Sequence, residues 1–303
     1  MSRQVCAAID NIKFESFGVD SGLSQQVVQT VFQDSKGFLW VGTQEGLNRY
    51  DGFKFRQYLH ERGNKDSLSD AWIRSISEDI YGNLWVGTTA GLNILNNETN
   101  KFLRISENEQ NSHQFVGKTV FEIWRDKSNN MWVLSDKGLN KHDRVSNTFT
   151  HIPLTIDGKS VNAVSVFQDV DYGIWIVANG SSLHFLAKDS VNIQSVPLSL
   201  QRNSTDNETL GKEISDYSIG RVFIDSKRRL WVATKDDGMF ISNDALHIMP
   251  KLPDHITFHS HASDINADIS KILEDSDGTI WFTSVSDGIF YLTQEQKIGH
   301  LTQ

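Results

Sequence analysis

Cysteine, proline and long apolar runs are scarce in this 303-residue sequence, and each shortage excludes a class of protein. The only cysteine is Cys6, so no disulfide can form within the chain, and cysteine usage fits a reducing or an oxidising compartment. Four prolines and a hydrophobic content of 38% are typical of a globular chain, not of a disordered or fibrous one. No run of about 18 apolar residues is present, so we expect no membrane-spanning helix in these residues.

Positive charge is also in short supply. The formal net charge is −9, and lysine and arginine form no concentrated patch along the sequence. Nucleic-acid binding needs such a patch to displace counterions from phosphates, so the sequence predicts no nucleic-acid partner. Complete P-loop, Gly-x-Ser-x-Gly and His-Glu-x-x-His motifs are missing as well. We therefore expect no catalytic residues and no cofactor.

Residues 1–12 are expected to form an N-terminal tail, and residues 13–303 a single all-β domain. Within the tail, Val5-Cys6-Ala7-Ala8 is similar to the small-residue end of a signal peptide, but the preceding apolar stretch is absent. A signal-peptide remnant and an ordinary tail therefore both stay open.

A repeated block dominates the rest of the sequence. Each copy has an apolar strand, an acid-rich turn and an apolar segment centred on tryptophan, and most copies continue into Gly-Leu or a similar pair. Six of the eight tryptophans occupy this place and follow one another at intervals of 43 to 56 residues: Trp40, Trp85, Trp132, Trp175, Trp231 and Trp281. This period, with strand-forming residues, is typical of β-propeller blades.

The chemistry of each block predicts strands and tight turns. Asp-x-x-Gly, as in residues 34–37, favours a hairpin turn, because Asp bonds its own backbone and Gly accepts a positive φ. Residues 38–43 are apolar on both faces, as a strand packed between two neighbouring sheets requires. The block tryptophans are therefore predicted to be core residues, each contributing about 3–5 kcal/mol to stability.

The fold prediction is a β-propeller of four-stranded antiparallel blades with six complete repeats of about 45–50 residues. Phe14-Glu15-Ser16-Phe17 precedes the first block and is typical of one extra outer strand. A strand from one terminus that completes a blade formed by the other would remove the exposed sheet edge. A six-bladed ring with a spare strand and a truncated seven-bladed ring both fit, and we favour the truncated ring.

Three stretches together resemble the two-component regulator propeller repeat: Gly22-Leu23-Ser24, residues 34–43, and residues 46–51. The resemblance extends over nearly the whole chain. Blocks three and four depart from it, with Leu134-Ser135 and Val177-Ala178 in place of Gly-Thr, and with Ser181-Ser182 before Leu183.

The resemblance implies a periplasmic sensor region of a receptor anchored in the inner membrane. The parent chain would carry a second propeller and an output domain, either a histidine kinase or a diguanylate cyclase, and would act as a receptor dimer. An oligosaccharide or another small ligand is the implied partner, and this region itself is not expected to be an enzyme. A protein-interaction scaffold and, less favoured, a propeller lyase or hydrolase are the alternatives.

Long loops joining the fourth strand of one blade to the first strand of the next are the predicted place for a ligand. Four residues at loop-to-strand junctions are the candidates: Trp72, Arg74, Tyr217 and Arg221. Aromatic faces beside guanidinium groups suit a sugar, especially an acidic one. The favoured interpretation is nevertheless structural: Trp72 and Tyr217 plug the ring, and the two arginines pair with acids. His255, His259 and His261 are weak metal candidates, for which a polar surface loop is the favoured interpretation.

Overall fold

The computed structural model is built almost entirely of β-strands. It describes residues 18–96, 98–105, 114–156, 159–160, 163–168, 173–178, 182–188, 190, 192–196, 198–201, 219–234, 239–242, 256–262, 269–274, 278–284, 288–292 and 298–301. The one helical element among these residues is the short 3-10 turn η1 (Val19–Ser21). No helix in this described part has the length and apolar character needed to cross a membrane.

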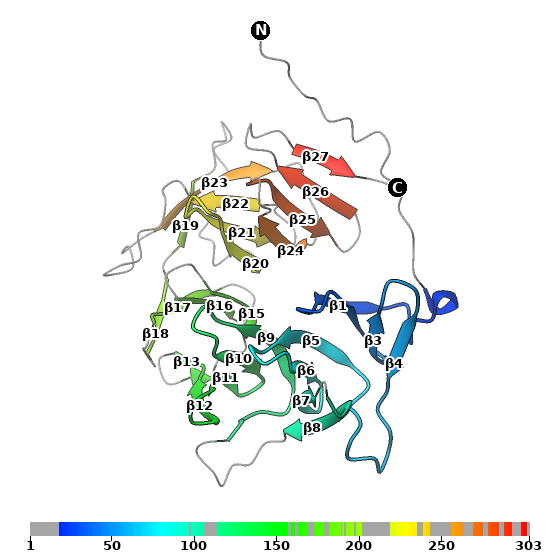
Figure 1. The fold of residues 1–303 in the computed structure, drawn as a ribbon. Coiled ribbons are helices and arrows are strands. Elements are labelled where there is room, and N and C mark those ends of the chain that lie inside the picture. The colour runs from blue at the N-terminus through cyan, green and yellow to red at the C-terminus, as the bar shows by residue number, and fades with distance from the viewer. Residues whose placement is uncertain are drawn as a thin grey trace.

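Six four-stranded antiparallel units follow one another along the chain, and we call them blades 1 to 6 (Figure 1). Blade 1 contains β1 (Val28–Gln33), β2 (Leu39–Thr43), β3 (Gly46–Tyr50) and β4 (Phe55–Tyr58). Blade 2 contains β5 (Ile73–Glu78), β6 (Leu84–Thr88), β7 (Gly91–Asn96) and β8 (Lys101–Ile105). Blade 3 contains β9 (Val120–Arg125), β10 (Met131–Ser135), β11 (Gly138–Asp143) and β12 (Thr148–Pro153).

The second half of the chain repeats this order. Blade 4 contains β15 (Ala163–Gln168), β16 (Ile174–Ala178), β17 (Ser182–Leu186) and β18 (Ile193–Ser195). Blade 5 contains β20 (Ile219–Ile224), β21 (Leu230–Thr234), β22 (Met239–Ser242) and β23 (Ile256–Ala262), and β19 (Leu198–Gln201) pairs in parallel with β23. Blade 6 contains β24 (Ile269–Glu274), β25 (Ile280–Ser284), β26 (Gly288–Leu292) and β27 (Ile298–Leu301).

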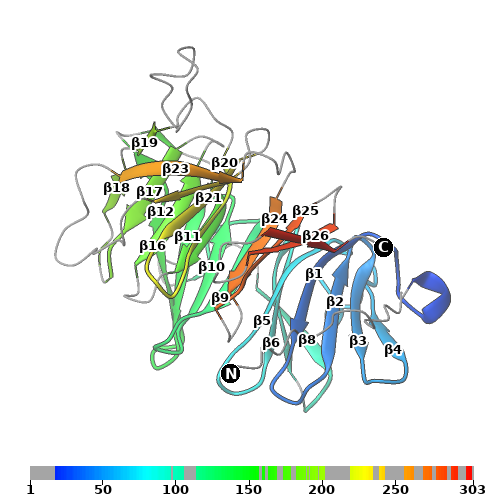
Figure 2. The same ribbon diagram turned by 90° about the horizontal axis from the view of Figure 1, so that it is seen from above.

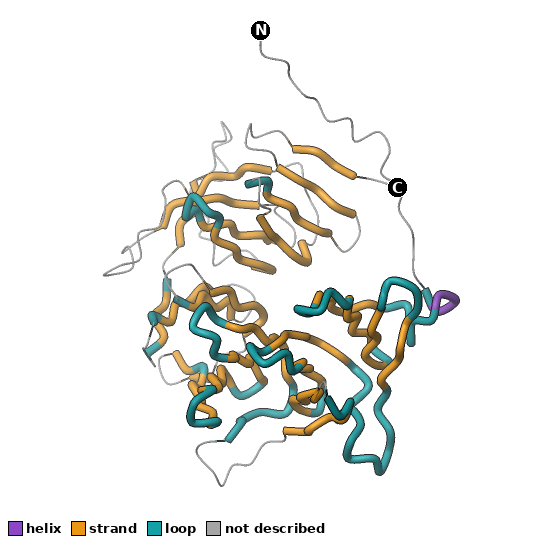
Figure 3. The backbone as a smooth tube through the Cα atoms, in the orientation of Figure 1, coloured by secondary structure: helices purple, strands orange, loops and turns teal. Residues whose placement is uncertain are grey.

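A small hairpin, β13 (Thr155–Ile156) with β14 (Lys159–Ser160), lies between blades 3 and 4 in the sequence. In the backbone view, short turns join most strands within a blade (Figure 3). Figure 2 shows the four strands of blade 1 side by side, from β1 to β4. The predicted all-β propeller of four-stranded antiparallel blades is confirmed.

The acidic turn of each block closes the first hairpin of its blade. In blade 1, one carboxylate oxygen of Asp34 accepts the backbone N–H groups of Lys36 and Phe38, and the other accepts the indole N–H of Trp40 at 2.7 Å. Gly37 has φ +86°, which glycine adopts without strain. The same Asp-to-Trp bond occurs in three further blades, at 2.9 to 3.1 Å: Asp79–Trp85, Asp126–Trp132 and Asp225–Trp231. The prediction that these acids form turns is confirmed for these four blades.

Buried asparagines form hydrogen bonds to the chain segment that precedes the first strand in each of the first three blades. Asn93 is 0% exposed; its side-chain oxygen accepts the backbone N–H of Ser69 at 2.8 Å, and its amide donates to the carbonyl of Val86. The same bond to a backbone N–H 24 residues earlier recurs in blades 1 and 3: Asn48 with Ser24, and Asn140 with Val116. The asparagine of the Gly-Leu-Asn motif is thus a structural residue, because it satisfies buried backbone groups.

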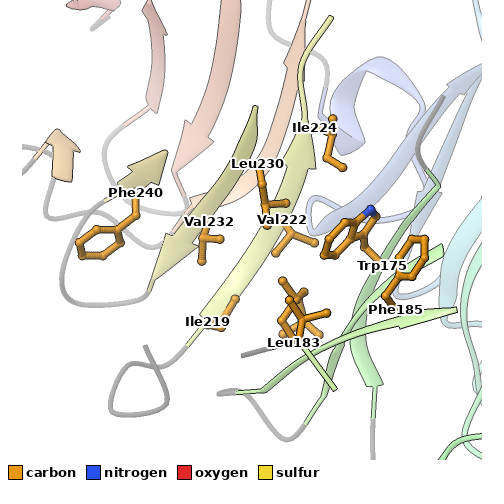
Figure 4. Packing of buried hydrophobic residues seen from close by; sticks show 11 residues of the cluster. Trp175, Leu183, Phe185, Ile219, Val222, Ile224, Leu230, Val232 and Phe240 are labelled. Carbon is orange, nitrogen blue, oxygen red and sulfur yellow. The ribbon is translucent and has the colours of Figure 1, made fainter. Parts of the chain in front are cut away.

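Tryptophans hold neighbouring blades together. In Figure 4, Trp175 of blade 4 lies in one cluster with Ile219 and Val222 of blade 5. The close approach is visible at Gly42, where an added Cβ would lie 2.6 Å from Cγ2 of Ile73 in the next blade. Five block tryptophans are buried, and this confirms their predicted core role: Trp40, Trp85, Trp132, Trp175 and Trp231.

The blades form a ring that stays open between blade 6 and blade 1 (Figure 1). Contacts join each blade to the next from blade 1 to blade 6. Residues 14–17, the predicted extra outer strand, lie outside the described residues, so that prediction stays open together with the choice between a six-bladed and a seven-bladed ring.

Candidate functional site

A cleft of about 490 Å³ lies between blades 2 and 3. Its walls come from β6, β7 and β8 on one side and from β10, β11 and β12 on the other. Turns that join the first to the second strand and the third to the fourth strand border its mouth, including Tyr81, Asn129, Arg144 and Asn147. These turns are at the opposite end of the blades from the long loops where the sequence predicts a ligand.

The inner wall of the cleft is aromatic. The imidazole of His142 lies 5.1 Å from the ring of Trp85 and 4.8 Å from the ring of Phe149, measured between ring centroids. Phe115 packs against Phe149 from behind, with their centroids 5.8 Å apart. These packed rings form a rigid apolar surface of the kind that ligand pockets commonly present.

His142 is one of the titratable residues that line the cleft, together with Asp79, Tyr81, Arg104 and Arg144. Burial lowers the pKa of its imidazole below the ordinary value of 6.5, although a hydrogen bond to Asn147 acts in the opposite direction. Nε2 of the ring lies 3.0 Å from Oδ1 of Asn147. The imidazole is therefore neutral at pH 7 and contributes a hydrogen-bonding ring, not a charge.

Two arginines bring positive charge to the cleft. The guanidinium of Arg104 is already engaged in hydrogen bonds within the protein, since it donates to the carbonyls of Asn64, Ser67 and Leu68. Arg144 is exposed in the turn between β11 and β12. Tyr81, 72% exposed, adds an aromatic face at the mouth. The cleft thus combines aromatic faces with an accessible guanidinium and amide groups.

The corresponding cleft between blades 3 and 4 is a natural comparison within the same molecule. It measures about 240 Å³ and lies beside Trp132, as the larger cleft lies beside Trp85. Lys141 takes the place that Ile94 holds in blade 2, and its ammonium lies 5.4 Å above the ring of Trp132. The long cationic side chain narrows this second cleft.

Two predicted site residues lie at the start of blade 2. Trp72 is 38% exposed and precedes β5, and its backbone N–H donates to a carboxylate oxygen of Asp70 at 3.0 Å. Arg74 is the second residue of β5, and its guanidinium lies 5.0 Å above the ring of Phe121 in blade 3. Its Nε is buried and has no hydrogen-bond partner among the described atoms, and burial lowers the pKa of the guanidinium.

Arg221 lies in β20 of blade 5, partly buried, and donates to the carbonyl of Gly220. Blades 2 and 5 are not neighbours, and no described contact joins Arg221 to Trp72 or Arg74. Tyr217 lies outside the described residues. The predicted ligand site on these four residues remains a prediction.

The histidine group falls largely outside the described side chains. His255 lies outside the described residues, and His259 and His261 belong to β23, where only the strand is described. His259 is opposite Ile241 of β22 in the register of the sheet. Among the residues that the structure describes, no group of three or more His, Cys, Asp or Glu side chains could hold a metal ion.

Sequence reasoning missed the cleft between blades 2 and 3. A signal existed in the aligned repeats, because the place of His142 in the third strand is taken by Tyr50, Leu95, Leu186 and Leu292 in four other blades. An imidazole in a column of apolar and aromatic residues could have been noticed. The assembly of His142 with Tyr81 and Arg144 could not have been predicted from the sequence, because it depends on how blades 2 and 3 pack together.

Comparison with known proteins agrees with the repeat. Residues 22–45 and 67–90 match the model of the two component regulator propeller. A segment of 59 residues is 44% identical to the histidine kinase P4 of Formosa agariphila; it makes up 20% of this chain and 4% of that protein.

Solved structures agree on the fold. The extracellular domain of a putative hybrid two component system from B. thetaiotaomicron superposes with a TM-score of 0.73 and 19% identity, over 95% of this chain and 36% of that chain. A virginiamycin B lyase from Staphylococcus aureus gives a TM-score of 0.63 and 12% identity, over 91% and 84% of the two chains. This chain thus spans about a third of the first structure, and at these identities the likeness concerns the fold alone.

Proposed function

We propose that this chain, which carries two-component regulator propeller repeats, is the extracytoplasmic ligand-sensing propeller of a transmembrane two-component receptor. The observation that carries the proposal is the match of that repeat at residues 22–45 and 67–90. The similarity of a 59-residue segment to a histidine kinase supports it, because it links these repeats to a kinase parent chain. The histidine kinase or diguanylate cyclase output, the second propeller and the inner-membrane anchor of the parent protein belong to the same proposal.

The ligand class that fits is an oligosaccharide, particularly one with acidic sugars. In the cleft between blades 2 and 3, Tyr81 and His142 offer ring faces on which a pyranose can stack. The exposed guanidinium of Arg144 can bind a carboxylate or sulfate group through two N–H donors.

The site predicted at Trp72, Arg74, Tyr217 and Arg221 is the second location for the same ligand class. It has an exposed indole at Trp72 and a partly buried guanidinium at Arg74. The two locations are at opposite ends of the blades, so variants in one leave the other intact.

Signalling requires that the ligand bind two receptor states with unequal affinity. A ligand held between two blades contacts both, so its affinity depends on their relative position. The rest of the parent receptor would convert that preference into a change in output activity.

A thermal-shift titration of this chain against neutral and acidic oligosaccharides tests the proposal. A ligand that binds only the folded state raises the melting temperature in a saturable way. For the cleft, Arg144→Ala and Tyr81→Ala should abolish the rise, and Lys141→Ala in the neighbouring cleft is the matched control. For the predicted site, Trp72→Ala and Arg221→Ala should abolish it, with the cleft variants unaffected.

The remaining outcomes distinguish the alternatives. Turnover of an oligosaccharide, detected as new reducing ends or unsaturated products, would support a propeller lyase or hydrolase. No shift with any oligosaccharide, together with capture of a protein partner, would support the interaction scaffold. A shift that EDTA abolishes would point instead to the histidines of residues 255–261.

A further inference from the structure

Two arginines lie side by side on the face of blade 1 that packs against blade 2. In the strand register, Trp40 of β2 is opposite Arg49 of β3, and Arg49 is opposite Arg56 of β4. Residues directly opposite each other in antiparallel strands share one face of the sheet. The face is the one directed at blade 2, because Trp40 shares a buried cluster with residues of that blade. We call Arg49 and Arg56 the arginine pair.

Two cations at this place are a feature of blade 1 alone among the six described sheets. In the other blades, the residue opposite the block tryptophan and the next residue across the sheet are mostly apolar or uncharged, and blade 3 has a single lysine. The five sets are Ile94 with Leu103, Lys141 with Thr150, Phe185 with Gln194, Ile241 with His259, and Tyr291 with Gly299.

No described carboxylate neutralises the arginine pair, since neither guanidinium forms an ion pair within the described part of the chain. The acids bonded near it have other partners: Asp34 accepts the indole N–H of Trp40, and Glu78 accepts two bonds from Ser35. Nε of Arg49 is buried without a hydrogen-bond partner among the described atoms. Like charges directly opposite each other on neighbouring strands are destabilising, so a bound anion would relieve a repulsion that the fold leaves in place.

Aromatic rings hold both guanidinium groups in place. Cζ of Arg49 lies 4.5 Å from the ring centroid of Phe38 and 5.9 Å from that of Trp40. Cζ of Arg56 lies 4.9 Å from the ring centroid of Tyr58. Stacking on a ring uses the flat face of a guanidinium and leaves the N–H donors in its plane available. Arg56 is exposed and Arg49 is half-buried, so the pair is accessible from solvent.

We propose that the arginine pair binds a tetrahedral oxyanion, either phosphate or sulfate, as the free ion or as the charged group of a monoester. A planar guanidinium binds two oxygens of such an anion at once, and two guanidinium groups match its double negative charge. This site is separate from the cleft between blades 2 and 3, and the proposal is independent of the sensing function proposed above.

The test is a thermal-shift titration of the full chain with sodium phosphate and with sodium sulfate, with chloride added to hold the ionic strength constant. Both anions stabilise folded proteins in general because they are excluded from protein surfaces. Binding at the arginine pair is therefore measured as the part of the rise in melting temperature that saturates.

We expect Arg49→Gln and Arg56→Gln each to weaken this saturable binding by about tenfold or more, because hydrogen bonds to a charged group are lost. Arg56→Lys keeps the charge without the planar fork, so it should bind with intermediate affinity. Lys141→Gln is the matched control, since Lys141 has the same place in blade 3 above Trp132 but no second cation opposite it, and it should bind as the unsubstituted chain does.

A saturable rise of full size in Arg56→Gln would overturn the proposal, as would the absence of any saturable rise in the unsubstituted chain. If the two glutamine variants lower the melting temperature equally in chloride and in phosphate, with no change in the anion-dependent rise, the arginines only pack on the rings. Loss of the rise in Lys141→Gln would place the anion elsewhere.

A second series identifies the source of the anion. Glucose 6-phosphate and glucose 6-sulfate are compared with the inorganic ions, and glucose is the uncharged control. Tighter binding of a monoester, lost in Arg56→Gln, would support the proposal with an ester group as the natural ligand. Tighter binding of the inorganic ion would support it with the free ion. A rise with glucose alone that equals the rise with its esters would contradict recognition of the charged group.

Discussion

At the scale of single residues, a few side chains perform the same structural task in several blades. The turn aspartates are one set, since each binds backbone N–H groups with one oxygen and an indole N–H with the other. The position with positive φ in that turn is Gly37, Gly82, Asn129, Arg228 or Gly278. Glycine and asparagine tolerate this conformation, whereas Arg228 at +65° bears a steric cost that the rest of its turn must offset.

Asp126→Ala should destabilise the chain by roughly 2–4 kcal/mol, because it leaves the buried indole N–H of Trp132 and the backbone N–H of Asn130 without acceptors. The measurement is the free energy of unfolding in urea. Asp143→Ala is the control, since Asp143 accepts similar backbone bonds in an exposed turn, and it should cost less. Equal losses for the two variants would contradict the role of the indole bond.

Two imidazoles, that of buried His184 and that of half-buried His142, make stability depend on pH. Burial lowers the pKa of His184 and of His142 below the ordinary value of 6.5. As the pH falls below 6.5, the unfolded chain therefore binds protons before the folded chain does, so stability present above that pH is progressively lost. His184→Gln should reduce the slope of unfolding free energy against pH below 6.5. An unchanged slope in this variant would show that His184 does not contribute.

At the scale of the element, the buried asparagines explain why each of the first three blades begins with a defined entry segment. Ser69 is bonded to Asn93 through its backbone N–H and its hydroxyl, and the hydroxyl also lies 2.9 Å from the hydroxyl of Thr88. Strands two and three of the blade thereby hold the segment that leads into strand one. The Gly-Thr and Gly-Leu-Asn parts of the repeat act together in this network.

Asn93→Leu should cost roughly 2–4 kcal/mol, because the partly buried N–H of Ser69 and the carbonyl of buried Val86 each lose a partner. Hydrogen exchange should show faster exchange at the Ser69 amide, in addition to a lower midpoint of unfolding. The matched control is Asn96→Ala, since Asn96 forms its bonds in an exposed turn. Retained protection of Ser69 in Asn93→Leu would rule out the fastening role.

At the scale of the whole molecule, each tryptophan stabilises the contact to the blade that follows it. The last blade differs from the others in the exposure of its tryptophan: Trp281 is partly exposed, whereas the tryptophans of blades 1 to 5 are buried. Stability should therefore be spread unevenly around the ring, in the way expected of repeat proteins whose units contact only their neighbours.

Trp231→Ala should destabilise the chain by about 3–5 kcal/mol, because it opens a cavity between blades 5 and 6. Trp281→Ala should cost clearly less, because its side chain is partly exposed, whereas Trp231 is fully buried. The measurement is the free energy of unfolding in urea of the two variants and of the unsubstituted chain. A similar loss for both would indicate that the opening next to blade 6 is filled in solution.

The sequence by itself determined the repeat, the four-stranded blade and the core role of the tryptophans. These depend on local chemistry, since turns, alternation and strand propensity are set by neighbouring residues and recur in every copy. The structure decided what depends on contact between blades. It placed Tyr81, His142 and Arg144 around one cleft, because the third-strand turn of blade 3 faces the first turn of blade 2. It also showed that Val28 and Val31 are exposed although their sequence resembles that of buried counterparts. Burial is decided by the neighbouring blade, which no local pattern of residues contains.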